Sequence, residues 1–387
     1  MQGGKHPFIL PAGSALAAFR CEHPLLRLQV NAMCVSEAGP VTAWPRSPSL
    51  RNGASVACLQ WPLLRPTGQR ETEVVSSESA PEQSAVVVFC EGSLSVERIR
   101  SRFPSIGVVD ISEGVPPGMR GDVLFGGWGP HSVDAMATGV RWVQMAGTGI
   151  DGAPPEVRAA PVLTSARGAS AVAISEYVIA TMGAFARNFP QNWLREAPEI
   201  WNYQPAGTLA GATLGLFGFG GIAQRVARIA LVMDMSVVAL RRRAVPSPID
   251  GVEMVRSLSD LVSVVDHLVL AAPATELTRH VIDADSLALM RPGVHLVNIA
   301  RGALVDQEAL RKALDDGTVA RASLDVTDPE PLPAGHWLFD HPRVFLTPHA
   351  SWVGPPFLEK ATDMFCDNLE RYLVGQPLQG VVGGEGY

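Results

Sequence analysis

The chain has 387 residues, 47% of them apolar and 18% charged, which is enough to bury a large core and favours two domains over one. Its net charge of −7, without a dense basic stripe, argues against a surface for nucleic acid or anionic membranes. Five scattered cysteines with no CxxC pair and no metal-ligand spacing predict a reducing, cytoplasmic setting and no metal site.

The first 83 residues have no sustained helical or strand periodicity and are rich in proline, serine and arginine, as in "VTAWPRSPSLRNGAS". This composition predicts a disordered or weakly ordered extension over 1–83. Two alternatives stay open at this point. The segment could be a targeting peptide, since Glu22 is the single acid in its first 36 residues, or it could result from a start codon placed too far upstream.

Order is expected to begin at Ser84, where short apolar runs alternate with helical stretches. The predicted strands of this region are 84–90, 106–111, 122–127 and 140–151, with a helix at 95–103. Such alternation is typical of parallel βαβ units, whose sites lie at the carboxyl ends of the strands. A long, largely buried helix is predicted over Ser170 to Asn188 and would lead the chain out of this first region.

A second series of short apolar runs follows a connection that contains proline and tryptophan. Its predicted strands are 213–217, 236–240, 266–272, 294–300, 321–326 and 343–348. A helix between them should be capped by Asp306 at its start and Gly317 at its end. The last helix, 356–373, has an apolar face that we expect to pack back on the first domain.

The stretch "GLFGFGGIAQRVA" predicts a site for a dinucleotide pyrophosphate. Gly218, Gly220 and Ala223 form a GxGxxA pattern after a strand and at the start of a helix, where Gly220, Gly221 and Ile222 would offer backbone N–H groups to phosphate. The pattern alone is a weak signal, because a glycine-rich turn can exist without a ligand. Its position between a strand and a helix strengthens it.

Three arginines follow the next strand, in "LRRRA". An NAD site usually has an acid here to bind the ribose hydroxyls, whereas arginine accommodates the 2′-phosphate of NADP. Arg241 and Arg242 therefore favour NADP(H) over NAD(H), since guanidinium groups bind phosphate through paired hydrogen bonds. A solvent-exposed basic loop would explain the charges but not the missing acid.

Polar residues follow several strands of the second half in the motifs "VNIARGALVD", "LDVTDPEP" and "TPH". With the glycine motif and "APATELTRHVIDADSLALMRPG", they occur in the order typical of one family. From about Ser84 to Tyr387 the chain resembles the D-isomer specific 2-hydroxyacid dehydrogenases, which include glyoxylate/hydroxypyruvate reductases. Several long motifs in one order are far more specific than the glycine pattern alone.

The resemblance assigns roles to residues of these motifs. It makes His349 the proton donor, Glu330 its carboxylate partner and Arg301 the cation that binds the substrate's carboxylate and carbonyl, which suits reduction of a ketone because negative charge develops on oxygen. A carboxylate beside an imidazole favours the protonated ring. The remaining contacts implied are Thr148 and Gly149 for the substrate carboxylate, and Pro273, Thr278 and Asp325 for the cofactor.

The chain also departs from the family pattern. Met145 and Ala146 stand where phosphoglycerate dehydrogenases have an arginine, which argues against a phosphorylated substrate. Gly152 replaces the usual asparagine after Asp151, and Ser351-Trp352 replaces an Ala-Gly pair after the predicted proton donor. Trp352 could narrow the substrate pocket.

We therefore predict two doubly wound, Rossmann-like α/β domains with the active site in the cleft between them. A dinucleotide-binding domain, 189–349, is inserted into a catalytic domain made of 84–188 and 350–387. The predicted reaction is NADP-dependent reduction of a small 2-oxo acid such as glyoxylate or hydroxypyruvate to the D-2-hydroxy acid, and the family implies a homodimer. The alternatives are a dinucleotide-sensing, corepressor-like binding protein and a dehydrogenase for formate or phosphite.

Overall fold

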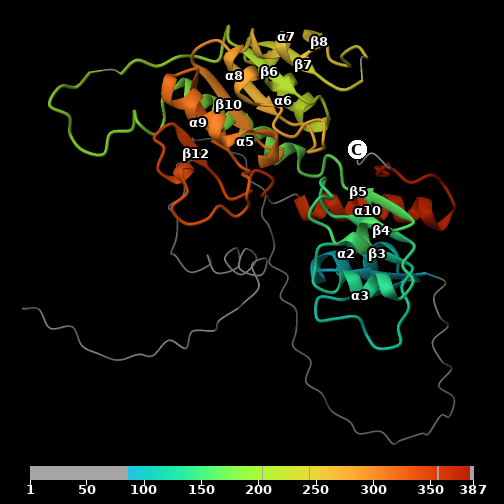
Figure 1. Ribbon diagram of the computed structural model, residues 1–387. Helices are drawn as coiled ribbons and strands as arrows, with labels where there is room; N and C mark the ends of the chain where they lie inside the picture. The colour runs from blue at the N-terminus through green and yellow to red at the C-terminus, as the bar shows by residue number, and fades with distance from the viewer. Residues whose placement is uncertain (1–85, 203, 244, 355–356, 384–387) are drawn as a thin grey trace, which may run out of the picture. The chain divides into compact units, whose positions relative to one another are not determined.

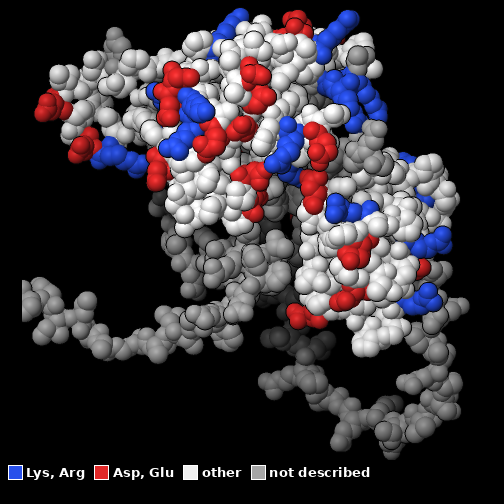
Figure 2. Space-filling model, in the orientation of Figure 1, with Lys and Arg blue, Asp and Glu red and all other residues white. Residues whose placement is uncertain are grey.

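The computed structural model describes residues 86–202, 204–243, 245–354 and 357–383 (Figure 1). The expectations for 1–83 lie outside these residues. Acidic and basic side chains are interspersed over the face drawn in Figure 2, in line with the modest net charge. No helix in the described ranges is both long and apolar enough to cross a membrane.

The first half of the described chain forms a five-stranded sheet. The strand order is β2 (Gly107–Asp110), β1 (Val87–Cys90), β3 (Val123–Gly126), β4 (Trp142–Met145), β5 (Val162–Ser165), and all neighbours are parallel. Its helices are α2 (Ser93–Arg102), α3 (Ser132–Ala137) and α4 (Pro155–Arg158). Strands β3 and β4 are buried along their whole length, as expected for a parallel sheet covered on both faces.

The second half forms a seven-stranded parallel sheet. Its order is β12 (Val344–Leu346), β11 (Val319–Leu324), β10 (Val294–Asn298), β9 (His267–Leu270), β6 (Thr213–Phe217), β7 (Ser236–Leu240), β8 (Val252–Val255). Helix α6 (Gly221–Val232) contributes to the core on one face. The other face carries α7 (Leu258–Val262), α8 (Ala284–Ala288) and α9 (Gln307–Asp316). The two parallel sheets confirm the predicted fold class.

The short pieces of helix complete the second half. They are the 3-10 turns η1 (Gly302–Leu304) and η2 (Trp337–Phe339).

Asp306 accepts hydrogen bonds from two N–H groups in the first turn of α9, and Gly317 ends that helix at φ +87°, so both predicted caps are confirmed.

Helix α5 (Ala171–Ala186) packs against the seven-stranded sheet. Its buried residues Ile174, Val178 and Met182 share a core with α6 and with residues of β6, β7, β9 and β10. The sequence predicted a buried helix here, but its periodicity could not indicate which sheet would cover the apolar side. The exact domain boundaries at 188/189 and 349/350 stay predictions.

Helix α10 (Phe357–Leu373) packs on the five-stranded sheet, although the whole second sheet lies between them in the sequence. Phe365 stacks on Phe125 and on Trp142, with ring centroids 4.6 and 5.3 Å apart. Figure 1 shows this red helix beside the strands of the first sheet. Apolar contact between the first strands of the described chain and its last helix therefore completes the core of the first half of the fold.

A buried polar contact fixes the register of α10. The side-chain amide of Asn368, 4% exposed, donates to Gln144 Oε1 (2.8 Å) and to the carbonyl of Gln379 (2.9 Å), and its oxygen accepts from the N–H of Gln379 (2.8 Å). The same amide thus joins β4, α10 and the chain that follows α10. Buried hydrogen bonds of this kind specify one arrangement, because a shifted helix would leave the groups unpaired.

Replacing Asn368 should destabilise the protein much more than replacing its exposed neighbour. We expect Asn368→Ala to lower the free energy of unfolding by about 2–3 kcal/mol, because it leaves buried polar groups unpaired. Asp367→Ala should cost less than about 1 kcal/mol, since its ion pair with Arg102 is exposed. Urea unfolding measures both, and equal losses would contradict the role given to Asn368.

Candidate active site

The glycine turn after β6 has room for a phosphate group. Gly218 lies at φ +96°, and a methyl group on it would come within 2.6 Å of the Ala272 backbone nitrogen, so this turn requires glycine. Gly220 precedes α6 without a side-chain cap, and Cβ atoms at Gly220 and Gly221 would meet nothing within 4 Å. The first turn of α6 contains no acid. These residues fit a dinucleotide pyrophosphate. Ile222, the next residue in the sequence, is half-buried.

The arginines stand at the end of β7, which pairs with β6. One terminal nitrogen of Arg241 donates to the carbonyls of Val245 and Pro246, at 3.0 and 2.9 Å, so this side chain also shapes its own loop. Its Nε is buried and has no partner among the described residues. Arg242 is exposed. No acid occurs between 241 and 249, so the loop fits an anionic group at this strand end.

Pro273 and Thr278 lie after β9, the other neighbour of β6. The hydroxyl of Thr278 donates to the carbonyl of Pro273 (2.8 Å), which closes the turn between them. Because β6, β7 and β9 are parallel neighbours, their carboxyl ends place this turn, the glycine turn and the arginine loop at one edge of the sheet.

His349 and Glu330 are in direct contact. Nδ1 of His349 lies 2.6 Å from Oε1 of Glu330, as the predicted pair requires. Burial raises the pKa of Glu330, but its hydrogen bond with His349 and the charges of His349 and Arg301 outweigh this, so the pKa is lowered. Glu330 therefore remains a carboxylate beside the imidazole.

Asp325 organises the loop that carries His349. Its carboxylate, 1% exposed, accepts hydrogen bonds from the hydroxyl of Thr347 (2.6 Å) and from the N–H groups of Ala350 (2.8 Å) and Ser351 (3.0 Å). His349 itself has a φ of +52°, an unusual conformation for a residue with a side chain. The role of Asp325 toward the nicotinamide carboxamide stays a prediction, while its contacts make it a support for this loop.

Arg301 follows β10 and contacts an acid that the sequence analysis did not pair with it. Its Nε donates to Oδ2 of Asp151 (2.7 Å), and another guanidinium nitrogen donates to the carbonyl of Ala300 (2.6 Å). Asp151 lies directly after the "AGTGI" loop. Its position after a strand-end glycine loop was the signal that could have identified it as a site residue.

The "AGTG" loop follows β4 of the first sheet. Among the described residues, the backbone N–H groups of Thr148 and Gly149 donate no hydrogen bond to the protein, which leaves them available to an anion. The Thr148 hydroxyl is buried and also lacks a partner in this part of the chain. The Arg301–Asp151 contact connects this loop with Arg301.

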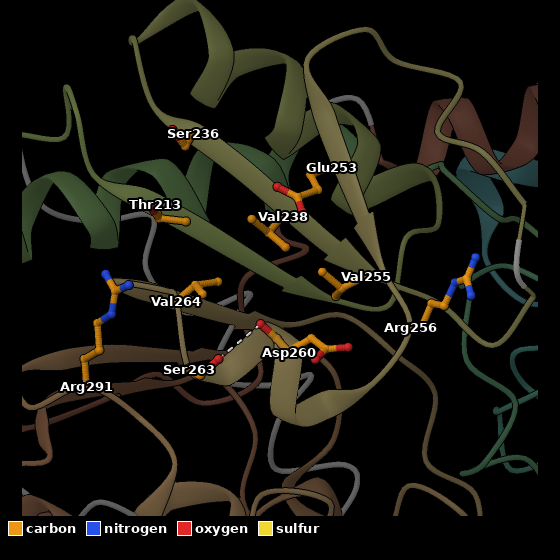
Figure 3. Close-up of a pocket in the computed structure, with 10 residues that line it drawn as sticks. All are labelled: Thr213, Ser236, Val238, Glu253, Val255, Arg256, Asp260, Ser263, Val264 and Arg291. Carbon is orange, nitrogen blue, oxygen red and sulfur yellow. Dashed lines mark hydrogen bonds between the residues drawn. The ribbon is translucent and has the colours of Figure 1, made fainter.

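A separate hollow lies away from these residues. It has a volume of about 680 Å³ and is lined by residues of β6, β7, β8 and α7, including Thr213, Ser236 and Arg291 (Figure 3). Thr213 and Ser236 begin their strands, whereas the predicted site residues follow strand ends. Its lining contains none of the predicted catalytic or cofactor-binding residues.

Comparison with known proteins agrees with this arrangement, which defines an α/β protein with a Rossmann-type dinucleotide fold. Residues 179–351 match the model of the D-isomer specific 2-hydroxyacid dehydrogenase, NAD binding domain. An (S)-sulfolactate dehydrogenase of Chromohalobacter salexigens is 36% identical over 213 residues, 54% of this chain and 69% of the relative. The chain belongs to the D-isomer specific 2-hydroxyacid dehydrogenase family.

Two further relatives define the extent of the similarity. A glyoxylate/hydroxypyruvate reductase A of Serratia proteamaculans is 28% identical over 264 residues, 65% of this chain and 83% of the relative. The crystal structure of the TT0316 protein from Thermus thermophilus is 29% identical, with a TM-score of 0.62 over 77% of this chain and all of that one. With two other curated relatives the match spans only 47% and 59% of their length.

Proposed function

We propose that the protein catalyses NADP-dependent reduction of a small 2-oxo acid, of the glyoxylate or hydroxypyruvate kind, to the D-2-hydroxy acid. The observation that carries the proposal is the 2.6 Å contact between His349 and Glu330, in a fold whose neighbouring strand ends hold a phosphate-sized turn and Arg301. Family membership and the relative named a glyoxylate/hydroxypyruvate reductase support it.

The substrate is held by its negative charge. Free N–H groups of Thr148 and Gly149 and the guanidinium of Arg301 would bind its carboxylate, with Asp151 fixing the orientation of Arg301. Met145 is fully buried and apolar, and Ala146 carries no charge, so this loop supplies no cation for a phosphate on the substrate. A small, unphosphorylated 2-oxo acid fits these residues.

The residues of the chain then complete the reduction. A dinucleotide held by the glycine turn at Gly218 and Gly220 and by Arg241 would supply hydride for the ketone carbon. As charge develops on the ketone oxygen, His349 donates a proton to it from the ring, and Arg301 stabilises the remaining charge. Glu330 stabilises the protonated imidazole and fixes its orientation through Nδ1. The donated proton leaves in the product hydroxyl, and His349 takes up a new proton from solvent.

Removing the proton donor or its partner should reduce activity in a graded way. His349→Ala should lower kcat by about 10²–10⁴-fold, and Glu330→Gln by about ten- to a hundredfold, with the cofactor still bound. The pKa of Glu330 is lowered, so Glu330 stays ionised below the ordinary pKa of a glutamate, which is about 4.3. The wild-type rate should therefore not fall through protonation of Glu330 until the pH is below that value. The absorbance of the reduced nicotinamide at 340 nm measures the rates of both variants and the pH dependence of the wild type.

The outcomes distinguish a 2-oxo acid reductase from a dinucleotide-sensing binding protein. Unchanged kcat in His349→Ala would contradict the assigned acid. Tight NADPH binding without turnover of any 2-oxo acid by the wild type would instead favour a dinucleotide-sensing binding protein.

The arginine loop supports NADP(H) as the cofactor. The buried, unpaired Nε of Arg241 and the exposed side chain of Arg242 follow the strand where an acid would bind the ribose of NAD. Arg241→Ala and Arg242→Ala should each weaken NADPH binding by about tenfold or more, because a charged hydrogen bond is lost. NADH binding should change little.

Titration calorimetry with NADPH and NADH tests this preference. Arg228→Ala is the matched control, since Arg228 is an exposed arginine of α6 that donates to the carbonyl of Gln224 in its own helix. Tighter binding of NADH than of NADPH by the wild type would refute the assignment of Arg241 and Arg242.

We infer further that the protein is a homodimer. Between α5 and β6 the described residues form no helix or strand, and Figure 1 shows this segment as a long loop. It exposes Trp193, Leu194, Ile200 and Trp201 by 54–85%. Exposed apolar groups gathered on one segment are typical of an interface.

Light scattering tests the dimer. The mass in solution should be about twice the 41.2 kDa of one chain, and Trp193→Ser with Trp201→Ser should shift it toward one chain because apolar contact area is lost. A wild-type protein that remains a single chain at micromolar concentration would contradict the inference.

A further inference from the structure

The half-buried carboxylate of Glu91, at the end of a strand of the first sheet, positions the loop that contains Trp128. Glu91 follows β1, and its Oε2 accepts hydrogen bonds from the N–H groups of Gly127 (3.0 Å) and Gly129 (3.1 Å). Its Oε1 accepts from the hydroxyl of Ser132 (2.5 Å). The two glycine contacts lie on either side of Trp128 in the sequence, so one carboxylate fixes the backbone on both sides of that residue.

The glycines of this loop are required by the contact with Glu91. A Cβ on Gly126 or on Gly129 would lie 2.4 Å from an oxygen of Glu91. Gly126 and Gly127 also have φ values of +131° and +89°, which side chains other than glycine rarely adopt. The "GGWG" sequence is thus a backbone shaped around one acid, with a large aromatic side chain at its tip.

The indole of Trp128 lies against the "AGTG" loop. A methyl group on Gly147 would be 2.7 Å from Cη2 of Trp128, and one on Gly152 would be 4.0 Å from its Nε1. Trp128 is nevertheless 40% exposed. The ring therefore covers the start of the loop that holds Thr148 and Gly149, and another part of its surface faces solvent.

We propose that Trp128, positioned by Glu91, is a wall of the substrate site that limits the size of the group attached to the 2-oxo carbon. This rests on the proposed function, because it places the substrate carboxylate at Thr148 and Gly149. A rigid aromatic ring next to that anchor leaves space for hydrogen or a hydroxymethyl group and excludes a bulky side chain. Glu91 is a positioning residue that acts through the loop.

The kinetic test compares a small and a large 2-oxo acid, glyoxylate and phenylpyruvate. Trp128→Ala should raise the ratio of kcat/KM for phenylpyruvate to that for glyoxylate by about tenfold or more. Glu91→Ala should raise the ratio in the same direction. Glu91→Gln should stay near the wild-type ratio, because its amide oxygen can still accept from the glycines and its NH₂ can donate to Ser132.

Glu97→Ala, an exposed acid of α2, is the matched control and should leave the ratio unchanged. An unchanged ratio in Trp128→Ala would overturn the proposed wall. A shift in Trp128→Ala without any shift in a folded Glu91→Ala would overturn the positioning role. If Glu91→Ala does not fold, Trp128→Ala still decides whether the ring limits substrate size, since that side chain is partly exposed.

A second measurement does not depend on activity. In protein labelled with 5-fluorotryptophan, the ¹⁹F resonance of Trp128, assigned by its loss in Trp128→Phe, should move or broaden in Glu91→Ala and keep its position in Glu97→Ala. An unmoved resonance in Glu91→Ala would refute the positioning role. If the wild type reduces no 2-oxo acid while this resonance behaves as expected, the proposed function fails and the positioning of Trp128 by Glu91 through the loop stands.

Discussion

The parallel direction of all strands in the second sheet is the constraint on which the rest of the site depends. Because every strand points the same way, residues that follow different strands gather at one edge. The residues brought there after β6, β7, β9, β10, β11 and β12 are Gly218, Arg241, Pro273, Arg301, Asp325 and His349. The predicted cofactor-binding and catalytic residues of this half thus share one edge of the sheet, although they are far apart in the sequence.

Charge is arranged at this edge in pairs. Arg301 contacts Asp151, His349 contacts Glu330, and each partner fixes the orientation of a group that would otherwise rotate freely. Asp325 fixes the backbone beneath His349. A preorganised set of this kind can stabilise developing charge without rearranging during the reaction. On the first sheet Glu91 has a comparable position beneath the "GGWG" loop, with an aromatic ring as the group it orients.

Regular elements were predictable where the hydrophobic pattern was strong. The runs before Gly218 and Arg301 are mostly apolar and almost entirely buried, so they were identified as strands. The edge strands β5 and β8 were not predicted, because "VLTS" and "VEMV" are four residues long and mix polar with apolar positions. Short edge strands are defined by pairing with a neighbour, and one sequence does not contain that information.

The sequence by itself determined the fold class, the glycine turn, the caps of α9 and the family, since each depends on residue types at fixed short spacings. It also identified His349 and Glu330 as a pair through the family motifs. Only the tertiary structure decided that α5 packs on the seven-stranded sheet and that Asp151 contacts Arg301. The Glu91 contacts with the loop around Trp128 also emerged only there, because they join residues whose separation in the sequence carries no periodic signal.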